Sequence, residues 1–150
     1  YWPSVGEVTE LGRTNYVGVA GYWGNVPTSA EARKYVGVFS NRTFNGFASI
    51  EDGTSNTLLF GEATGGKDDE DDAVTEVFGL TWMGCGSFVT GGGLTTRNWF
   101  TFNSNHPNIV QFCMADGAVR KVNRGIDNTM YTRILAGMRD RQAASLADVQ

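Results

Sequence analysis

The sequence predicts an α+β fold built mainly on an antiparallel β-sheet. Glycine accounts for 20 of the 150 residues, and a glycine inside a helix costs about 1 kcal/mol relative to alanine. Aromatic residues make up 12% of the chain and charged residues only 19%. This mixture is typical of short strands joined by many turns. A hairpin pattern near residue 110 is the third observation, and it gives the predicted sheet its centre.

The hairpin pattern spans residues 109–122. An apolar run over residues 109–114 (IVQFCM) is followed by Ala115-Asp116-Gly117 and then by a mixed run over residues 118–122 (AVRKV). Asp-Gly between two such runs is a strong hairpin signal, because glycine accepts a positive φ without strain from a Cβ atom. We therefore expect two antiparallel strands with a tight turn between them.

The only histidine of the chain, His106, lies at the open end of this hairpin. A two-residue turn at Asp116-Gly117 would place His106 opposite Asp127. A three-residue turn with a bulge would shift that pairing by one residue. In either register, the imidazole could connect the loop before the hairpin to the cap of the following helix.

The first third of the chain predicts short strands and turns. Residues 1–13 show no clear period and are expected to form an extended arm. Residues 14–20 alternate in the manner of a strand, a helical turn is expected over residues 30–34, and a short strand is expected over residues 35–39. Residues 40–46 are rich in turn formers.

The middle of the chain begins with a compact turn, Asp52-Gly53-Thr54-Ser55-Asn56. Side chains of these types bond to nearby backbone amides, and Gly53 can adopt the left-handed conformation. The following run, Leu58-Leu59-Phe60, predicts a strand that is buried on both faces. Residues 74–83 predict a further strand, and residues 84–93 a hairpin tip or an irregular crossing.

The C-terminal part predicts one helix over residues 128–137, capped by Asp127. Its apolar positions recur at spacings of one, three and four residues: Met130, Tyr131, Ile134, Leu135 and Met138. Residues 139–150 alternate charged residues and alanine, and we expect a loose tail or a second short helix there. Residues 1–150 are long enough for a single domain with its own core.

Three blocks of the sequence together resemble a known family. Residues 14–21 (TNYVGVAG) and 50–62 (IEDGTSNTLLFGE) are similar to two of its blocks, and His106 followed by nine residues and Asp116-Gly117 is similar to a third. The chain thus resembles the prepilin-processing-associated His-X(nine)-Asp-Gly family. This is a planctomycete-type, pseudopilin-like family that is also labelled a domain of unknown function and solute-binding protein family ten.

The resemblance implies a pilin-like globular head, here without the long N-terminal helix. Family members carry a prepilin leader and a long hydrophobic helix. The opening Tyr1-Trp2-Pro3-Ser4 resembles the middle of a member, so we expect a mature or truncated globular part. The implied function is that of a structural subunit of an extracellular or envelope filament, of the type II secretion or type IV pilus kind. Such a subunit acts by self-assembly, as a homo-oligomer.

Nine residues of the two C-terminal blocks are the candidate site residues. The resemblance implies that they hold the head rigid and perform no chemistry, so we expect that the protein is not an enzyme. They are Asp52, Gly53, Thr54, Ser55, Asn56, Glu62, His106, Asp116 and Gly117.

The charge pattern excludes nucleic acid as a partner. The net charge is −4, and the run Lys67-Asp68-Asp69-Glu70-Asp71-Asp72 accounts for it, with five acids and one base. The balanced remainder has no basic stripe that could neutralise phosphates. No apolar run approaches the ~20 residues needed to cross a bilayer, so we expect no membrane contact by this part of the chain.

Metal and cysteine chemistry are weakly indicated. One histidine and two cysteines 28 positions apart do not form a zinc ligand set. The run Asp68–Asp72 offers oxygen ligands for calcium but lacks the alternation and the glycine of an EF-hand loop, so we expect no cofactor, with calcium as the alternative. Cys85 and Cys113 can form one disulfide or remain buried thiols.

Two other functions remain open at this point. A carbohydrate- or peptide-binding module of the envelope would use a groove lined by Trp23, Trp82 or Trp99. A hydrolytic enzyme would use His106 as a base. The sequence has no Gly-x-Ser-x-Gly motif, and nothing sets the separation of Asp52 and Glu62 that a paired-carboxylate glycosidase would need.

Overall fold

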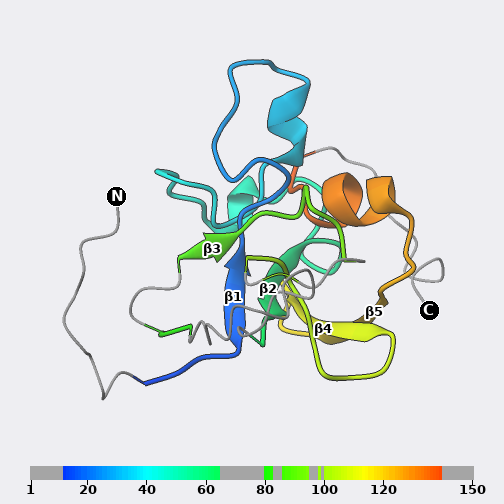
Figure 1. The fold of residues 1–150 in the computed structure, drawn as a ribbon. Coiled ribbons are helices and arrows are strands. Elements are labelled where there is room, and N and C mark those ends of the chain that lie inside the picture. Colours follow the sequence, from blue (N-terminus) through cyan, green and yellow to red (C-terminus); the bar gives the residue numbers. More distant parts are fainter. Residues whose placement is uncertain (1–11, 65–79, 83–85, 95–97, 99, 140–150) are drawn as a thin grey trace.

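Five strands form one mixed sheet in the order β3–β1–β2–β4–β5 (Figure 1). This computed structural model describes residues 12–64, 80–82, 86–94, 98 and 100–139. The strands are β1 (Tyr16–Val19), β2 (Leu58–Glu62), β3 (Ser87–Phe88), β4 (Ile109–Met114) and β5 (Val119–Asn123). β1 runs parallel to β3, whereas β1–β2, β2–β4 and β4–β5 are antiparallel. The β-rich, mostly antiparallel prediction is confirmed at this level.

Helical structure is short throughout the described part of the chain. It consists of η1 (Ala32–Tyr35), η2 (Phe47–Ser49) and η3 (Met130–Leu135). None of these described helices is long and apolar enough to span a membrane. The sheet, rather than the helices, therefore determines where the candidate site residues lie.

The predicted hairpin is present as β4 and β5, with a three-residue loop at its tip. Cys113 pairs with Val119, and the Met114 amide donates to the Ala118 carbonyl at 2.8 Å. The loop is thus Ala115-Asp116-Gly117, with Gly117 at φ 87°. The pairing that follows from a two-residue turn is wrong by one position, because the left-handed glycine adds a bulge to the turn.

The strand β2 is buried on one face, and the prediction of burial on both faces is wrong. Leu58 and Gly61 are buried, but Leu59 is half-buried and Phe60 is 37% exposed. A register shift between Leu58 and Phe60 interrupts the regular alternation of side chains, so Leu58 and Gly61 face the core while Phe60 lies on the other face. Phe39 packs against Phe60 on the other face, with 4.9 Å between the ring centroids.

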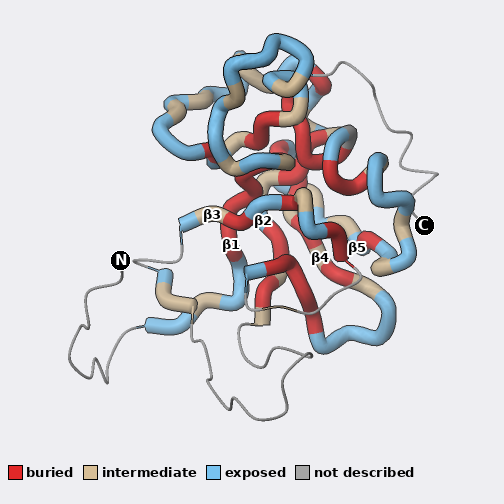
Figure 2. Tube along the Cα trace, turned by 45° about the horizontal axis from the view of Figure 1, so that its top comes forward, coloured by how far each residue is buried: buried red, intermediate tan, exposed pale blue. Residues whose placement is uncertain are grey.

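The core lies on the opposite face of the sheet, and Figure 2 shows buried tube along β1, β2 and β4 and also in segments outside the strands. A row of aromatic rings runs through it from β3 to η3. Phe88 contacts Phe102, Phe102 contacts Phe112, and Phe112 contacts Tyr131, with centroid distances of 5.6, 5.3 and 5.8 Å. Such tilted and edge-to-face pairs add to the free energy gained by burial alone.

Three further predictions are corrected by the structure. Residues 35–39 are not a strand, because Tyr35 ends η1 and Val36 forms only an isolated bridge with Gly21. Of the two alternatives for residues 84–93, the hairpin tip is wrong: residues 86–93 form the short parallel edge strand β3 and are otherwise irregular. The helix expected over residues 128–137 is mainly the shorter η3. Its cap is confirmed, because the Met130 amide donates to Asp127 Oδ1 at 2.9 Å.

Several predicted elements lie wholly or largely outside the described residues. They are the arm over residues 1–13, the strand over 74–83, the acidic run 68–72 and the tail 139–150. Of these ranges the structure describes residues 12–13, 80–82 and 139 alone. They stay predictions.

Tyr131 in the core predicts a stabilising substitution. Its side chain is 1% exposed, and its hydroxyl has no hydrogen-bond partner among the described residues. We expect Tyr131→Phe to raise the free energy of unfolding by about 1 kcal/mol, because it removes a buried, unpaired polar group. Tyr16→Phe, at a 56% exposed tyrosine, is the matched control and is expected to change it by less than about 0.5 kcal/mol. Urea denaturation measures both.

The same substitution should change the alkaline limit of stability. Burial raises the pKa of Tyr131 well above its ordinary value of 10.0. The unfolded chain therefore loses this proton at a lower pH than the folded chain. The contribution of the neutral tyrosine to the free energy of unfolding is fully present below pH ~10 and falls as the pH rises further. The Tyr131→Phe variant should lose less stability above pH ~10 than the unsubstituted chain. Equal slopes for the two proteins would contradict this prediction.

Candidate functional site

The pairing of β2 with β4 brings the two C-terminal motif blocks side by side. Phe60 pairs with Cys113 and Gly61 with Phe112, after a register shift between Leu58 and Phe60. As a result, the turn before β2 meets the tip of the β4–β5 hairpin, and the end of β2 meets the start of β4. Residues that are about 50 positions apart in sequence thus form two clusters, one at each end of this strand pair.

The first cluster joins two turns through the backbone. The Asp116 amide donates to the Thr54 carbonyl at 3.0 Å, and the Ala115 amide donates to the Thr57 carbonyl at 2.8 Å. Asp116 also fixes its own loop, because its Oδ1 accepts from the Ala118 amide at 2.9 Å. The cluster therefore holds the hairpin tip against the turn before β2.

The turn over residues 52–56 is confirmed. Gly53 has φ 89°, and the Asn56 amide nitrogen Nδ2 donates to the Asp52 carbonyl at 3.0 Å. Asn56 Nδ2 and the Thr57 hydroxyl both donate to carbonyls of this turn, whereas backbone amides were the expected partners. Asp52 is buried and Ser55 is exposed.

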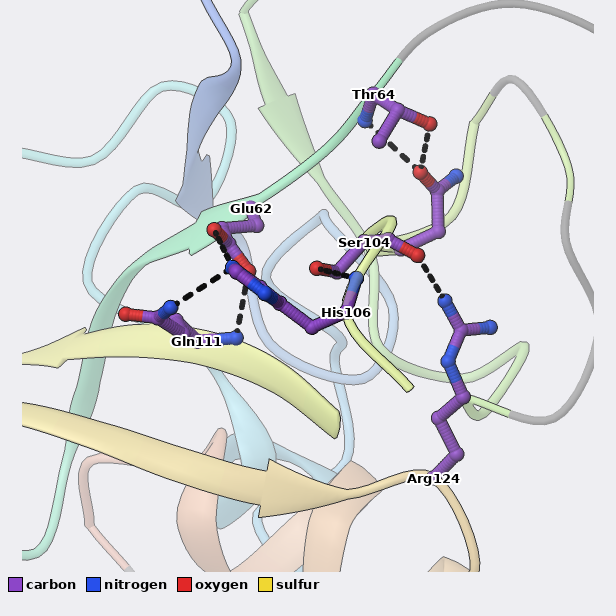
Figure 3. A network of polar contacts seen from close by, with 7 residues as sticks. Glu62, Thr64, Ser104, His106, Gln111 and Arg124 are labelled. Carbon is purple, nitrogen blue, oxygen red and sulfur yellow. Dashed lines mark hydrogen bonds and ion pairs between the residues drawn. The ribbon is translucent and has the colours of Figure 1, made fainter. Parts of the chain in front are cut away.

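The second cluster consists of Glu62, His106 and Gln111 (Figure 3). The Gln111 backbone amide donates to Glu62 Oε2 at 2.9 Å. His106 Nε2 lies 2.9 Å from Gln111 Nε2 and 3.6 Å from Glu62 Oε1. The Glu62 side chain is only 14% exposed, whereas that of His106 is 49% exposed. The carboxylate thus caps the end of the β2–β4 ladder, and the imidazole covers it from the solvent side.

The loop that carries His106 is anchored by its neighbours. The His106 amide donates to Ser104 Oγ at 3.0 Å, and Arg124 donates from Nη2 to the Ser104 carbonyl at 2.6 Å (Figure 3). The predicted approach of His106 to Asp127 is wrong, because its imidazole contacts Glu62 and Gln111 and Asp127 instead caps the helical turn before η3.

Asn103 is a key residue that sequence reasoning missed. It is 2% exposed, and its amide hydrogen-bonds in four directions. Oδ1 accepts from the Thr64 amide at 2.8 Å and from the Thr64 hydroxyl. Nδ2 donates to the carbonyls of Asn98 and Thr101, each at 3.0 Å. No sequence pattern marks such a residue, because its partners are set by the tertiary packing.

A polar hollow of about 220 Å³ lies beside the second cluster. The start of β1, the end of β2 and the loop before β4 surround it. Its lining residues are Asn15, Tyr16, Glu62, Ala63, Thr64, Ser104, Asn105 and His106.

An apolar hollow of about 440 Å³ lies between η2, the preceding loop and β2. Two phenylalanines at its margin, Phe44 and Phe47, are fully exposed and 72% exposed respectively. Its other lining residues are Val38, Phe39, Ser40, Thr43, Asn45, Gly46, Ile50 and Leu59. The described residues that line the two hollows include no tryptophan.

The contacts of His106 bear on the hydrolase alternative. Among the described residues, the ring makes polar contacts with Glu62 and Gln111. Ser104 is 4% exposed, and its Oγ receives the backbone amide of His106 rather than the ring. The contacts of His106 with the described residues therefore do not include the hydrogen bond between a nucleophile and a base that acyl transfer needs.

Several residues of the disulfide, groove and calcium alternatives lie outside the described part of the chain. Cys85, Trp99 and the acidic run 68–72 lie outside the described residues. The Cys85–Cys113 disulfide and the calcium alternative therefore stay predictions. Within the described residues, no group of three or more His, Cys, Asp or Glu side chains could hold a metal ion.

Replacing His106 tests whether it has more than a structural role. We expect His106→Ala to lower the free energy of unfolding by no more than about 1 kcal/mol, because the imidazole is half exposed and its approach to Glu62 is screened by water. Thermal unfolding followed by circular dichroism measures this. Gln111→Ala is the companion variant, since it removes the other contact of the ring and leaves the backbone bond to Glu62. A loss above about 2 kcal/mol for His106→Ala would contradict the expectation.

Comparison with known proteins identifies one family. The model of the family described as "Protein of unknown function (DUF1559)", SBP_bac_10, matches residues 4–129. No curated protein and no solved structure matches the chain. The matched range contains all three sequence blocks and both clusters of the site.

Proposed function

The chain belongs to the DUF1559 family of proteins of unknown function, and from this premise we propose that it is a structural subunit of a pilus-like or pseudopilus-like filament. The filament would lie outside the cell or in its envelope. The mechanism is assembly, in which copies of the chain bind one another through exposed apolar surface. The pilin-like character of the domain is part of the same proposal.

The exposed phenylalanines at the apolar hollow carry this proposal. Phe44 is fully exposed and Phe47 is 72% exposed, side by side with the half-buried Leu59 of β2. Large apolar patches of this kind on a soluble domain mark interaction sites. Covering them with a second copy would be favourable by about 25 cal/mol for each Å² of apolar surface removed from water.

The arrangement of the motif blocks supports a scaffolding role for this domain. Hydrogen bonds join β2 and β4 at both ends, through Thr54 with Asp116 and through Glu62 with Gln111. A filament subunit must keep its shape while neighbours bind it, and clusters of this kind restrict the relative motion of the two strands. The outer edge of β5, where Val119 is 65% exposed, offers a second place for contact between copies.

The test is the state of association of the purified chain. Sedimentation velocity across a concentration series and negative-stain electron microscopy should show association of the unsubstituted chain. The double variant Phe44→Ser/Phe47→Ser should remain monomeric. Val26→Ser is the matched control, because Val26 is 45% exposed but does not line the hollow. Monomers at every concentration for the unsubstituted chain would overturn the proposal.

An envelope module for carbohydrate or peptide binding is the second candidate. Trp23 is 55% exposed and Trp82 is 68% exposed, and Trp23 lies edge-to-face with Tyr22 at 4.3 Å. Exposed aromatic rings are common ligand platforms. A saturable change of tryptophan fluorescence with an oligosaccharide or peptide, lost in Trp23→Ala, would favour this function over assembly.

A further inference from the structure

We propose that the polar hollow beside Glu62 is a binding site for a primary ammonium group. The hollow measures about 220 Å³ and is lined mainly by polar side chains. This proposal uses the second cluster of the site and does not depend on the filament. A monomeric chain would have the same ammonium site.

The Glu62 carboxylate has unused acceptor capacity. An ionised carboxylate has two oxygens and about four acceptor positions. Oε2 accepts from the Gln111 amide at 2.9 Å. Among the described residues, Oε1 has only the 3.6 Å approach of His106 Nε2, which is too long for a hydrogen bond. Within the described part of the chain, this largely buried carboxylate oxygen at the wall of the hollow therefore has no hydrogen-bond donor.

The neighbours of Glu62 do not supply that donor. His106 Nε2 is in contact with the Gln111 side chain at 2.9 Å. Arg124, the cation nearest in this network, is turned toward the Ser104 carbonyl, to which it donates at 2.6 Å (Figure 3). Among the described residues, the ion pair of Glu62 is the 3.6 Å approach of His106, and an ammonium group in the hollow would be a closer donor to Oε1.

The other walls suit an ammonium group. Tyr16 is directly opposite Glu62 in the β1–β2 ladder, so the two side chains lie on the same face of the sheet. Tyr16 is 56% exposed, and its ring can face a cation. Asn15, Thr64 and Asn105 also line the hollow. An ammonium group has three donors and needs acceptors in addition to one carboxylate.

A divalent metal ion fits this hollow less well. Among the described residues of its lining, Glu62 is the only carboxylate. Calcium takes six to eight oxygen ligands, usually with several carboxylates. One carboxylate balances a single positive charge, and the volume lies below the ~300 Å³ at which pockets for drug-sized ligands begin. The fitting ligand is an ammonium head group on a short alkyl chain.

The single histidine makes this site directly observable. In nuclear magnetic resonance spectra, the imidazole signals come from His106 alone. Ethylammonium chloride should shift these signals in a saturable manner, and sodium chloride at the same ionic strength should not. Glu62→Gln should weaken the binding by at least ~tenfold, because it removes a charge-assisted hydrogen bond. Glu31→Gln, at the exposed carboxylate that pairs with Lys34, is the control and should bind with unchanged affinity.

A second probe distinguishes a lysine side chain from a small free amine as the ligand. N-acetyl-lysine methylamide carries the same ammonium group on a protein-like side chain. Binding of both probes indicates a site that accepts lysine side chains, and binding of ethylammonium alone indicates a site for small amines.

Defined results would overturn the proposal. They are the absence of a saturable shift with either probe, or equal affinity in Glu62→Gln. If Glu62→Gln does not fold, Tyr16→Ala takes its place. A weaker affinity in that variant supports the site, and an unchanged affinity overturns it. Neither result bears on fibre formation, which is read out separately by sedimentation and microscopy.

Discussion

Replacing Asn103 with alanine is expected to lower the free energy of unfolding by roughly 3–5 kcal/mol, because several buried polar groups lose their partners at once and each costs about 1–3 kcal/mol. The Thr64 amide and hydroxyl would lose their acceptor. The carbonyls of Asn98 and Thr101 would lose a donor. Water cannot easily replace these bonds at a residue that is 2% exposed.

The effect should be specific to this buried amide. Asn128→Ala is the matched control, because Asn128 is exposed near the start of the C-terminal helix and its side chain makes no hydrogen bond with another described residue. Its expected change is within about 0.5 kcal/mol. Chemical denaturation of the two variants gives the comparison. A loss below about 1 kcal/mol for Asn103→Ala would mean that the loop over residues 98–104 is not held by this residue.

Replacing Gly61 with alanine is expected to lower the free energy of unfolding by about 3 kcal/mol, at the upper end of the 1–3 kcal/mol typical of an overpacked core. An added Cβ atom would lie 2.4 Å from Phe112 Cε1 and 2.5 Å from Phe102 Cδ1. Both rings are essentially buried, at 1% and 0% exposure, so neither can move aside without disturbing the aromatic row.

Gly46→Ala separates this steric effect from the general effect of losing a glycine. No atom lies within 4 Å of the position that its Cβ would take, and its φ of −103° is accessible to alanine. That variant should be as stable as the unsubstituted chain or up to about 1 kcal/mol more stable, because alanine restricts the unfolded chain. Equal losses in Gly61→Ala and Gly46→Ala would show that the rings rearrange freely around position 61.

The local elements were predictable because their signals lie within a few residues. The β4–β5 hairpin follows from two apolar runs around Asp116-Gly117, and the turn at Gly53 follows from its run of turn formers. β1 and the Asp127 cap were also foreseen. The family was recognisable from motif spacing, and its match over residues 4–129 confirms that level of the assignment.

The wrong predictions concern segments whose local sequence pattern fits more than one structure. Leu58-Leu59-Phe60 is apolar throughout, yet only one face of β2 is buried, because the core is packed on one side of the sheet. Because the hairpin loop has one residue more than a two-residue turn, every cross-strand partner of β4 differs by one position from the pairing predicted for that turn. The pattern of residues 35–39 (YVGVF) resembled a strand, but residue 35 ends η1 and residue 36 makes only a single bridge.

Local patterns along the chain were enough to predict a β-rich domain of its family, with a tight hairpin and a compact turn. They did not show that these two segments are neighbours, that Glu62 lies beneath His106, that Asn103 is buried, or that Phe44 and Phe47 are exposed; these features follow from the folded arrangement. The difference lies in the range of the interactions. Turn and strand preferences act between adjacent residues, whereas burial and the partners of a side chain depend on segments about 40–50 positions away.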